Sequence, residues 1–415
     1  MARIAIYIGR HLCTAPRPCK EADALAAAGH EVTVSGLWSD PRLVARDEAL
    51  LAGRSWQFTP YADCRPGTLG RRWRWWRIRA RQRLARELFV RTGRVPADAF
   101  GYGTRLLAAH AERTAADLSI FHSEGGLWAA ARLQRTGRRV GVDFEDWFSR
   151  DLAPSAQATR PVAALARLER AALRSGPYVL STSRAMAEAL AAAYDGPPPT
   201  AIYNTFPIAG TPCARAAVDP ARISLHWFSL FLGPERGLET LFAALPLLPE
   251  SWELHLRADD PANYAGHLLA GLPERLRPRV MLHPTVSNAE LPACIAGHDV
   301  GLALDVSHIP SRNLTVTNKL FQYLQAGLGI VASTTAGHAE VLQAAPGAGE
   351  MFTAGDPAAL AAALRRLCAD PARLTVAKRA ARHAGETVFA HERQATRYAE
   401  LAAQALALAP GNLAG

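Results

Sequence analysis

The sequence predicts an α/β protein with two domains, and three features support this prediction. Short runs of apolar and β-branched residues alternate along the chain with longer stretches rich in alanine, leucine and arginine. Such alternation is typical of βαβ units that form a mainly parallel sheet. The 415 residues, of which 49% are hydrophobic and 20% charged, are enough for two separate cores. Residues 206–222 contain proline and glycine without clear periodicity, as a linker between domains does.

Two series of strands are expected, one on each side of this linker. The first is expected at residues 3–9, 31–36, 117–122, 139–143, 178–183 and 200–204, and the second at residues 223–228, 252–257, 279–283, 300–304, 329–333 and 350–352. From about residue 356 the sequence is typical of helix almost throughout. We therefore expect an N-terminal domain at 1–205, the linker at 206–222, a C-terminal domain at 223–385, and a final helix at 386–415 that returns to the N-terminal domain.

Cysteine usage and hydropathy indicate the compartment. The six cysteines are scattered, and no two have the C-x2-C spacing of zinc or dithiol sites. We expect reduced, packing thiols, with a bridge between Cys13 and Cys19 as the alternative. The short apolar run at residues 1–10 indicates a buried strand rather than a secretion signal. Since no segment has the roughly 20 apolar residues of a spanning helix, we expect a soluble or peripheral protein and not an integral one. Together with the reduced thiols, the basic segment at residues 71–91 leads us to expect a cytoplasmic protein that lies peripherally on the inner face of the cytoplasmic membrane.

Polar residues follow several of the expected strands. Ligands of open parallel sheets bind at the carboxyl ends of strands, and His11, His122, Glu124 and Asp146 occupy such positions. Glu124, Glu145 and Asp146 bring carboxylates to two neighbouring strand ends, where they can orient hydroxyl groups or take a proton. The alternative is that these carboxylates cap helices.

The most informative stretch is residues 315–334, TVTNKLFQYLQAGLGIVAST, in which a polar loop enters a helix that ends at Gly327. Thr315, Thr317 or Asn318 can cap the first turn, and the free backbone N–H groups of a helix start suit a diphosphate. Lys319 lies in that turn, where a cation is unfavourable for the helix unless an anion neutralises it. The alternative is a solvated lysine.

A second basic residue lies at a strand-to-helix junction. The apolar run of residues 223–232 leads into Gly233-Pro234-Glu235-Arg236-Gly237 and then into an amphipathic helix. The guanidinium of Arg236 can bind phosphate oxygens with two N–H groups at once, which lysine cannot do. The alternative is a surface arginine paired with Glu235 or Glu239.

These two elements resemble landmarks of the retaining glycosyltransferases of GT-B fold in glycosyltransferase family four, and the resemblance spans nearly the whole chain. Residues 236–239, RGLE, resemble the helix start that precedes the family's donor domain. Residues 318–327, NKLFQYLQAG, resemble its N-K-x-x-E-Y-x-x-x-G helix closely. Weaker similarities lie at residues 201–207 and 297–307. The resemblance implies two Rossmann-like domains that face each other across a cleft.

The chain departs from the family pattern at several positions. The family's two glutamates, separated by seven residues, are replaced by Leu314 and Gln322. A Gln322 amide still bonds a ribose hydroxyl, but without charge. The basic residue that usually follows the first strand of the donor domain is absent, because Ser229 and Leu230 stand there, and Lys319 is the expected substitute. Residues 257–260, RADD, replace a glycine-rich turn.

The resemblance assigns roles to the candidate residues. It implies that His122 contacts the transferred sugar, and that Arg236 and Lys319 stabilise the leaving diphosphate. The expected donor-binding residues are Arg236, Gly237, Thr317, Asn318, Lys319, Leu320 and Gln322, and the expected acceptor-binding residues are His11, Glu124, Glu145 and Asp146. We expect no cofactor, because the acidic residues form no clear metal-binding D-x-D. A nucleotide-sugar isomerase or hydrolase, and an inactive scaffold of polysaccharide assembly, are the alternatives.

One segment explains the net charge of +10. Residues 71–91 hold nine arginines and one glutamate, a net charge of +8. In a helix, Trp73, Trp76, Ala80, Leu84 and Leu88 would form one apolar stripe, with Trp75 and Ile78 outside it.

We expect this basic helix to bind anionic lipid headgroups, and the expected membrane-binding residues are Arg71, Arg72, Trp73, Arg74, Trp76 and Arg77. Several members of the resembling family dock on membranes, which favours a lipid-linked, lipopolysaccharide or other cell-envelope glycan acceptor. The alternative is that the stripe packs on the N-terminal domain. Nucleic-acid binding is not expected, since no known module surrounds the arginines.

Overall fold

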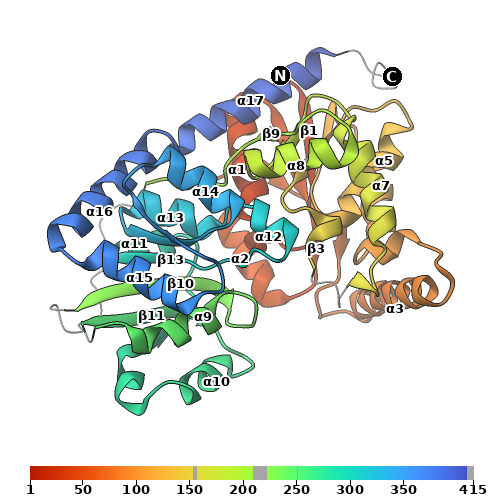
Figure 1. Ribbon diagram of the computed structural model, residues 1–415. Coiled ribbons are helices and arrows are strands. Elements are labelled where there is room, and N and C mark those ends of the chain that lie inside the picture. Colours follow the sequence, from red (N-terminus) through yellow and green to blue (C-terminus); the bar gives the residue numbers. More distant parts are fainter. Residues whose placement is uncertain (153–156, 209–221, 250, 409–415) are drawn as a thin grey trace. The chain divides into compact units, whose positions relative to one another are not determined.

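The computed structural model describes residues 1–152, 157–208, 222–249 and 251–408, which divide into two compact units (Figure 1). Unit 1 contains Met1–Ile202 and Ala395–Gly415, and unit 2 contains Tyr203–Gln394. The described residues of the expected linker belong to unit 2, and its residues 209–221 lie outside the described ones. The end of the chain belongs to unit 1, where Tyr398 and Ala402 pack into the core.

Unit 1 is built on a seven-stranded parallel sheet with the strand order β4-β2-β1-β6-β7-β8-β9. Its strands are β1 (Arg3–Tyr7), β2 (Glu31–Ser35), β4 (Gln57–Phe58), β6 (Leu118–Phe121), β7 (Val140–Phe144), β8 (Val179–Ser181) and β9 (Thr200–Ala201). β3 (Leu37–Trp38) and β5 (Ala62–Asp63) form a separate pair. The sequence did not predict β3, β4 or β5, because a strand of two residues has no periodicity to detect.

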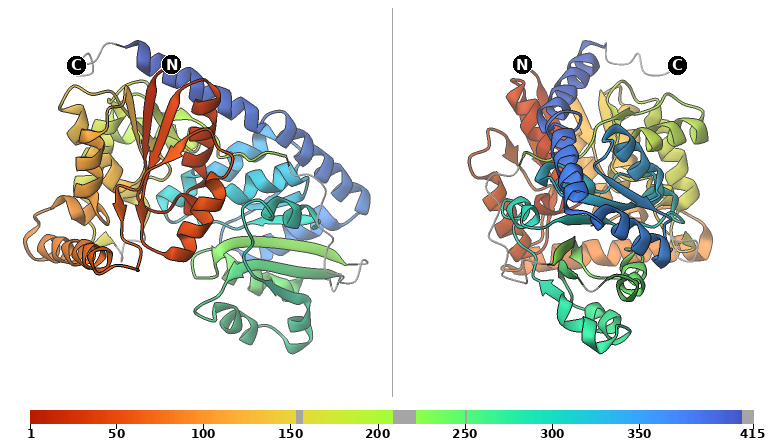
Figure 2. Two further views of the ribbon diagram at one scale, coloured as in Figure 1. Left: turned by 180° about the vertical axis from the view of Figure 1, so that it is seen from behind. Right: turned by 60° about the vertical axis from the view of Figure 1, so that its left-hand side comes forward.

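Helices cover the sheet of unit 1, which explains why β6 and β7 are buried along their whole length. The helices described in unit 1 are α1 (Pro16–Ala27), α2 (Pro41–Leu51), α3 (Leu69–Thr92), α4 (Thr104–Arg113), α5 (Glu124–Gln134), α7 (Val162–Leu173), α8 (Arg184–Tyr194) and the unit 1 part of α17 (His391–Ala407), with short 3-10 turns at Leu12–Thr14, Ala97–Phe100 and Phe148–Arg150. Figure 2 shows β1 and β2 side by side in this layered arrangement.

Unit 2 contains a six-stranded parallel sheet in the order β12-β11-β10-β13-β14-β15. Its strands are β10 (Ile223–Phe231), β11 (Trp252–Asp259), β12 (Val280–His283), β13 (Val300–Ala303), β14 (Gly329–Ser333) and β15 (Gly349–Phe352). Its helices are α9 (Leu238–Ala244), α10 (Tyr264–Ala270), α11 (Leu291–Ala296), α12 (Pro310–Leu314), α13 (Asn318–Ala326), α14 (Ala336–Ala344), α15 (Pro357–Cys368) and α16 (Pro371–Glu386), with 3-10 turns at Leu245–Leu247 and Glu274–Arg279. Every strand of the expected second series is present, so the α/β class is confirmed.

Cys13 and Cys19 are free, buried thiols, and burial raises the pKa of each to about 12. The alternative of a bridge between them is therefore wrong. Thiols of this kind stay protonated at neutral pH and pack as small apolar groups.

Four histidines gather on one face of the unit 2 sheet. His226 of β10 pairs in register with His255 of β11. The ring of His226 stacks on His298 with centroids 4.4 Å apart, and the ring of His255 stacks on His283 at 5.2 Å. His226 is completely buried, and neither of its ring nitrogens has a hydrogen-bond partner. A buried imidazole without partners is much more stable neutral than charged.

This cluster predicts that unit 2 loses stability in mild acid. Burial and the charges of Arg257 and His255 lower the pKa of His283 to about 4, and burial holds the pKa of His226 well below its ordinary value. Because the unfolded histidines titrate near 6.5, the unfolded chain takes up protons first as the pH falls. The free energy of unfolding should decrease below about pH 6.5, by about 2 kcal/mol at pH 5 from His283 alone.

Urea unfolding at pH 7.5 and pH 5 measures this loss. His226→Phe is the comparison variant. The phenyl ring can pack against the same aromatic neighbours, and it has no group that titrates. The pH dependence should be smaller in this variant than in the wild type. Equal pH dependence in the two proteins would contradict a role for His226.

Candidate functional site

A network of buried charges lies at the carboxyl ends of β6 and β7 in unit 1. Nε2 of His122 lies 2.8 Å from Oε2 of Glu21, and Nδ1 lies 3.3 Å from Oε1 of Glu145. Tyr178 donates to the other oxygen of Glu21 at 2.6 Å. Burial alone would lower the pKa of His122, but the attraction of Glu21 and Glu145 outweighs it and raises this pKa to about 10. His122 is therefore an imidazolium at neutral pH.

Arg17 supplies the second cation of this network. Its Nε donates to Oδ2 of Asp143 at 2.6 Å, and its guanidinium also donates to two backbone carbonyls. Ligand atoms of Glu21, His122 and Asp143 lie within 4.8 Å of one another, a spacing that a metal ion could use. Arg17 and the imidazolium already neutralise these carboxylates, so a metal ion would have to displace both cations. The network joins α1 to the ends of β6 and β7 and holds Glu145 beside His122, and the expected contact of His122 with the transferred sugar stays a prediction.

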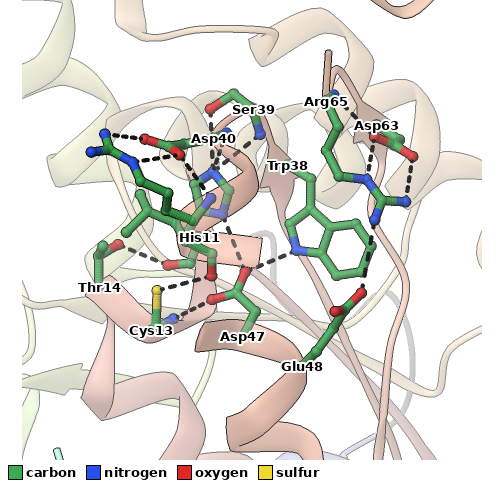
Figure 3. A network of polar contacts seen from close by, with 12 residues as sticks. His11, Cys13, Thr14, Trp38, Ser39, Asp40, Asp47, Glu48, Asp63 and Arg65 are labelled. Atoms are coloured by element: carbon green, nitrogen blue, oxygen red, sulfur yellow. Dashed lines mark hydrogen bonds and ion pairs between the residues drawn. The ribbon is translucent and has the colours of Figure 1, made fainter. Parts of the chain in front are cut away.

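His11 is held in a separate network of polar contacts (Figure 3). Its Nδ1 donates to Asp47 at 3.2 Å, and its Nε2 accepts from the backbone N–H groups of Ser39 and Asp40 at 3.1 and 3.2 Å. Asp47 also accepts from the indole N–H of Trp38 at 2.8 Å. Both ring nitrogens are thus engaged within unit 1. The ring connects the loop after β1 to α2, and the expected acceptor role of His11 stays a prediction.

The remaining acceptor candidates lie at the ends of β6 and β7. Glu124 is the first residue of α5, after the N-cap Ser123, and it accepts a hydrogen bond from Arg160. Glu145 and Asp146 directly follow β7 and are partly buried. The structure brings Glu145 to His122, and the acceptor roles of these carboxylates stay predictions.

The basic segment forms the 24-residue helix α3, which lies at the outer edge of unit 1 (Figures 1 and 2). Trp73 and Trp76 are each 61% exposed and meet edge to face at 5.4 Å. Leu84 is 68% exposed on the same helix. The helix is anchored instead by Ile78, which is buried, and by Trp75, which packs against the same small core. The alternative in which the Trp73 stripe packs on the domain is therefore wrong.

A hollow of about 700 Å³ lies beside this helix. It is lined by Ser39, Cys64, Pro66, Leu69, Arg72, Trp73, Trp75, Trp76 and Arg79. Indole and guanidinium groups thus face solvent together. In the described residues no helix has the length and apolar character needed to cross a bilayer.

In unit 2, the loop between β10 and α9 is held in an unusual conformation. Glu235 has φ +59° and Gly237 has φ +75°. A Cβ at Gly237 would lie 2.1 Å from the carbonyl oxygen of Leu304, so only glycine fits there. The loop therefore lies directly against the carboxyl end of β13.

This close approach predicts a large effect of Gly237→Ala. The substitution should lower the free energy of unfolding by more than about 2 kcal/mol, because it adds backbone strain to a steric clash. Gly233→Ala, in the same loop, is the control, since a Cβ there meets nothing within 4 Å. Urea unfolding of the two variants measures the difference, and equal stability would contradict the geometry of this loop.

Basic side chains gather around this loop. Arg236 donates to the hydroxyl of Ser229 at 3.0 Å, and Arg312 of α12 donates to the carbonyl oxygen of Glu235 at 2.9 Å. Lys319 is partly buried, with its Nζ 5.4 Å from the ring centre of Trp227. Burial lowers the pKa of Lys319, and the charges of Arg236 and Arg312 add to this effect against the opposing pull of a carboxylate.

That carboxylate is Asp305. Its Oδ2 lies 3.3 Å from Nε2 of His338, the third residue of α14. Burial alone would raise the pKa of Asp305, but Lys319, His338 and Arg312 hold this pKa far below its ordinary value. Asp305 is therefore an anion among several cations.

The start of α13 completes this arrangement. Thr317 is the N-cap residue, but its side chain makes no capping bond, which leaves the helix start open to an anion. Asn318 accepts from the amide of Asn204 at 2.6 Å. Oε1 of Gln322 is buried without a hydrogen-bond partner. The side chain of Leu320 lies in the unit 2 core, so its expected part in donor binding, which stays a prediction, would fall to its backbone N–H group.

The sequence of this region matches a known family. Residues 225–370 match the family model of glycosyl transferases group 1. The match includes β10, the loop of Arg236 and helix α13. No curated protein matches the sequence.

Solved structures resemble the whole chain. Sucrose-phosphate synthase from Thermosynechococcus elongatus has a TM-score of 0.70 at 18% identity, over 97% of this chain and 99% of that chain. HepE from Anabaena, in complex with UDP-glucose, has a TM-score of 0.68 at 15% identity, over 97% and 100%. CalG4, the calicheamicin glycosyltransferase, has a TM-score of 0.52 at 16% identity, over 99% and 100%. These similarities confirm the predicted fold class, two Rossmann-like domains of the GT-B type.

Sequence reasoning missed two charged residues of this site. Arg312 and Asp305 belong to residues 304–317, which connect β13 to α13 and contain only the short helix α12. They lie seven and fourteen positions before Lys319, but no continuous helix joins the three residues, so helical periodicity does not relate them. The position of Asp305 just after β13 was the available signal, since ligands gather at the carboxyl ends of strands.

Proposed function

We propose that the protein is a glycosyltransferase that moves a sugar, with retention of anomeric configuration, from a nucleoside-diphosphate sugar to a hydroxyl group of a membrane-associated glycan, glycolipid or lipopolysaccharide. One observation carries this proposal. Within the residues that match glycosyl transferases group 1, Arg236 and Lys319 lie with an uncapped helix start and a buried, unpartnered Gln322. Cations and free backbone N–H groups suit the diphosphate of a nucleoside diphosphate. The Gln322 amide oxygen, which has no partner, suits a hydroxyl of its ribose.

Each group has a distinct part in donor binding. Arg236 and Lys319 bind the diphosphate oxygens, together with the backbone N–H groups of the α13 start around Thr317 and Asn318. Oε1 of Gln322 accepts a hydrogen bond from a ribose hydroxyl. The UDP-glucose in the HepE structure supports a donor of this class.

The reaction breaks the bond between the sugar's anomeric carbon and the diphosphate oxygen. The leaving diphosphate gains negative charge as this bond breaks, and Arg236, Lys319 and the helix dipole stabilise that charge without reorganising. The acceptor hydroxyl attacks on the face that the diphosphate leaves, and its proton passes to the departing phosphate oxygen. Such a reaction needs neither a protein nucleophile nor a metal ion. In unit 1, Glu145, which lies beside the imidazolium of His122, orients a hydroxyl of the acceptor sugar in this proposal.

Product analysis tests this proposal. The protein is incubated with UDP-, GDP- and dTDP-sugars labelled in the sugar, with and without membranes of the source cell, in the presence of EDTA. Transfer of label only when membranes are present supports the transferase. Free sugar or an isomerised donor without membranes would favour a hydrolase or isomerase, and no conversion under any condition would favour the inactive scaffold.

We further propose that α3 docks the protein on an anionic membrane surface. Indoles prefer the headgroup boundary, and the surrounding arginines bind lipid phosphates. The exposure of Trp73 and Trp76 beside a helix anchored by Ile78 supports this, because the outward face is apolar and the flanks are basic.

Removal of both indoles should weaken membrane binding. Trp73→Ala with Trp76→Ala should reduce binding to phosphatidylglycerol vesicles about tenfold or more, because each indole loses its contact with the acyl boundary. Vesicle co-sedimentation measures this effect. Val376→Ala, an exposed apolar residue of α16, is the control. Unchanged binding of the double variant would remove the basis for docking through α3.

A further inference from the structure

We propose that Arg312 is a second phosphate-binding arginine of the donor site and binds the diphosphate beside Arg236 and Lys319. This inference rests on the proposed function, which it deepens by naming a residue that the motifs do not show. The first strand of unit 2 ends in Ser229, Leu230 and Phe231, where Ser229 only accepts from Arg236 and Leu230 is 51% exposed. These side chains bring no cation to the diphosphate.

Arg312 reaches the same loop from a different part of the chain. Its Nη1 donates to the carbonyl oxygen of Glu235 at 2.9 Å and lies 3.7 Å from Oε2 of that residue. Glu235 directly precedes Arg236, and its carbonyl oxygen accepts the hydrogen bond from Arg312. The guanidinium of Arg312 therefore lies beside the loop that carries the first phosphate-binding arginine.

The side chains around Arg236 and Arg312 carry an excess of positive charge, which favours the binding of an anion there. Arg236, Arg312 and Lys319 bring three cations to a region where Asp305 and Glu235 are the carboxylates that contact or face them. The charges of the two arginines also lower the pKa of Lys319, so the like charges act on one another. A guanidinium has five N–H donors, and its bond to Glu235 leaves others for phosphate oxygens. A bound diphosphate would remove this excess of positive charge.

The competing role for Arg312 is purely structural: its hydrogen bond would only hold the loop of Glu235 in place. If Arg312 only holds the loop, its removal weakens the binding of every ligand whose site depends on the loop. If Arg312 binds phosphate, its removal weakens only the part of the affinity that the phosphates contribute. The nucleoside without phosphates therefore separates the two roles.

Calorimetric titration of the full chain with UDP, uridine and inorganic pyrophosphate tests the inference, with GDP and ADP run alongside. In Arg312→Gln, affinity for UDP and for pyrophosphate should fall about ten- to a hundredfold, while affinity for uridine stays at the wild-type value. Arg312→Lys should be intermediate, because it keeps the charge without the planar fork. Arg365→Gln, an exposed arginine of α15 in the same unit, is the matched control.

The outcomes separate this inference from the proposed function. If Arg312→Gln binds UDP and pyrophosphate as the wild type does, or loses uridine and UDP equally, the inference is wrong while the function stands. If the wild type binds pyrophosphate through Arg312 but binds no nucleotide, the proposed function fails and the anion site remains. A wild type that binds none of these ligands overturns both.

Discussion

Arg236→Ala should reduce kcat/KM for sugar transfer about a thousandfold. Arg236 is proposed to stabilise the charge that develops on the leaving diphosphate, and loss of one preorganised donor to such a charge costs about a hundred- to a thousandfold in rate. Most of the loss should appear in kcat, since the interaction strengthens as the bond to the sugar breaks. Initial rates at varied donor concentration measure both parameters.

The control for this variant is Arg365→Ala, which removes an exposed arginine of unit 2 that bonds the backbone of Leu247. It should keep wild-type activity. Arg236→Lys should lie between the two, because lysine retains the charge but binds one oxygen at a time. If Arg236→Ala retains wild-type kcat while remaining folded, Arg236 has no part in diphosphate stabilisation.

Glu21→Ala should lower the free energy of unfolding by about 3–5 kcal/mol. Glu21 is completely buried, and it bonds both His122 and Tyr178. Its removal leaves a buried imidazolium and a buried hydroxyl without their partner, which costs far more than the net value of the ion pair. Urea unfolding measures the loss, and Glu31→Ala at the exposed start of β2 is the control.

The pH dependence gives this variant a second signature. Because His122 has a folded pKa of about 10 and an unfolded value near 6.5, its contribution is fully present below about pH 6.5 and is lost as the pH rises toward 10. Wild-type stability should therefore fall between pH 6.5 and pH 9.5. Glu21→Ala should show a smaller fall, and an equal fall in both proteins would contradict the assignment of the raised pKa to Glu21.

The sequence predicted those strands and helices that a local run or pattern of residues marks. Ile4 and Ile6 of β1, and Gly329–Ser333 of β14, belong to buried strands that appear as apolar runs bounded by polar residues. The start of α13 was also predictable, because a polar loop, a basic first turn and a final glycine mark it in order. These patterns are local in the sequence. A local pattern predicts the structure correctly when the tertiary contacts favour the same secondary structure.

The sequence could not predict contacts between distant residues. His122 is paired with Glu21, which lies 101 positions earlier on α1, and no local pattern indicates such a partner. On α3 the periodicity left open whether the stripe binds a membrane or packs on the domain, and only the structure shows that Trp73, Trp76 and Leu84 face solvent. The residues that anchor this helix, Trp75 and Ile78, lie outside the stripe. Periodicity shows which residues share a face, but not which face the rest of the unit covers.

The most direct test of the central claim is a thermal-shift titration of the purified protein with UDP, GDP, dTDP, ADP and CMP and their common sugar conjugates. A ligand that binds only the folded protein raises its melting temperature, by an amount that grows with the ratio of its concentration to Kd. The account predicts that one nucleoside diphosphate and its sugar conjugates stabilise the wild type, and that Arg236→Ala largely loses this response. No stabilisation by any of these ligands would contradict the account and favour the inactive scaffold.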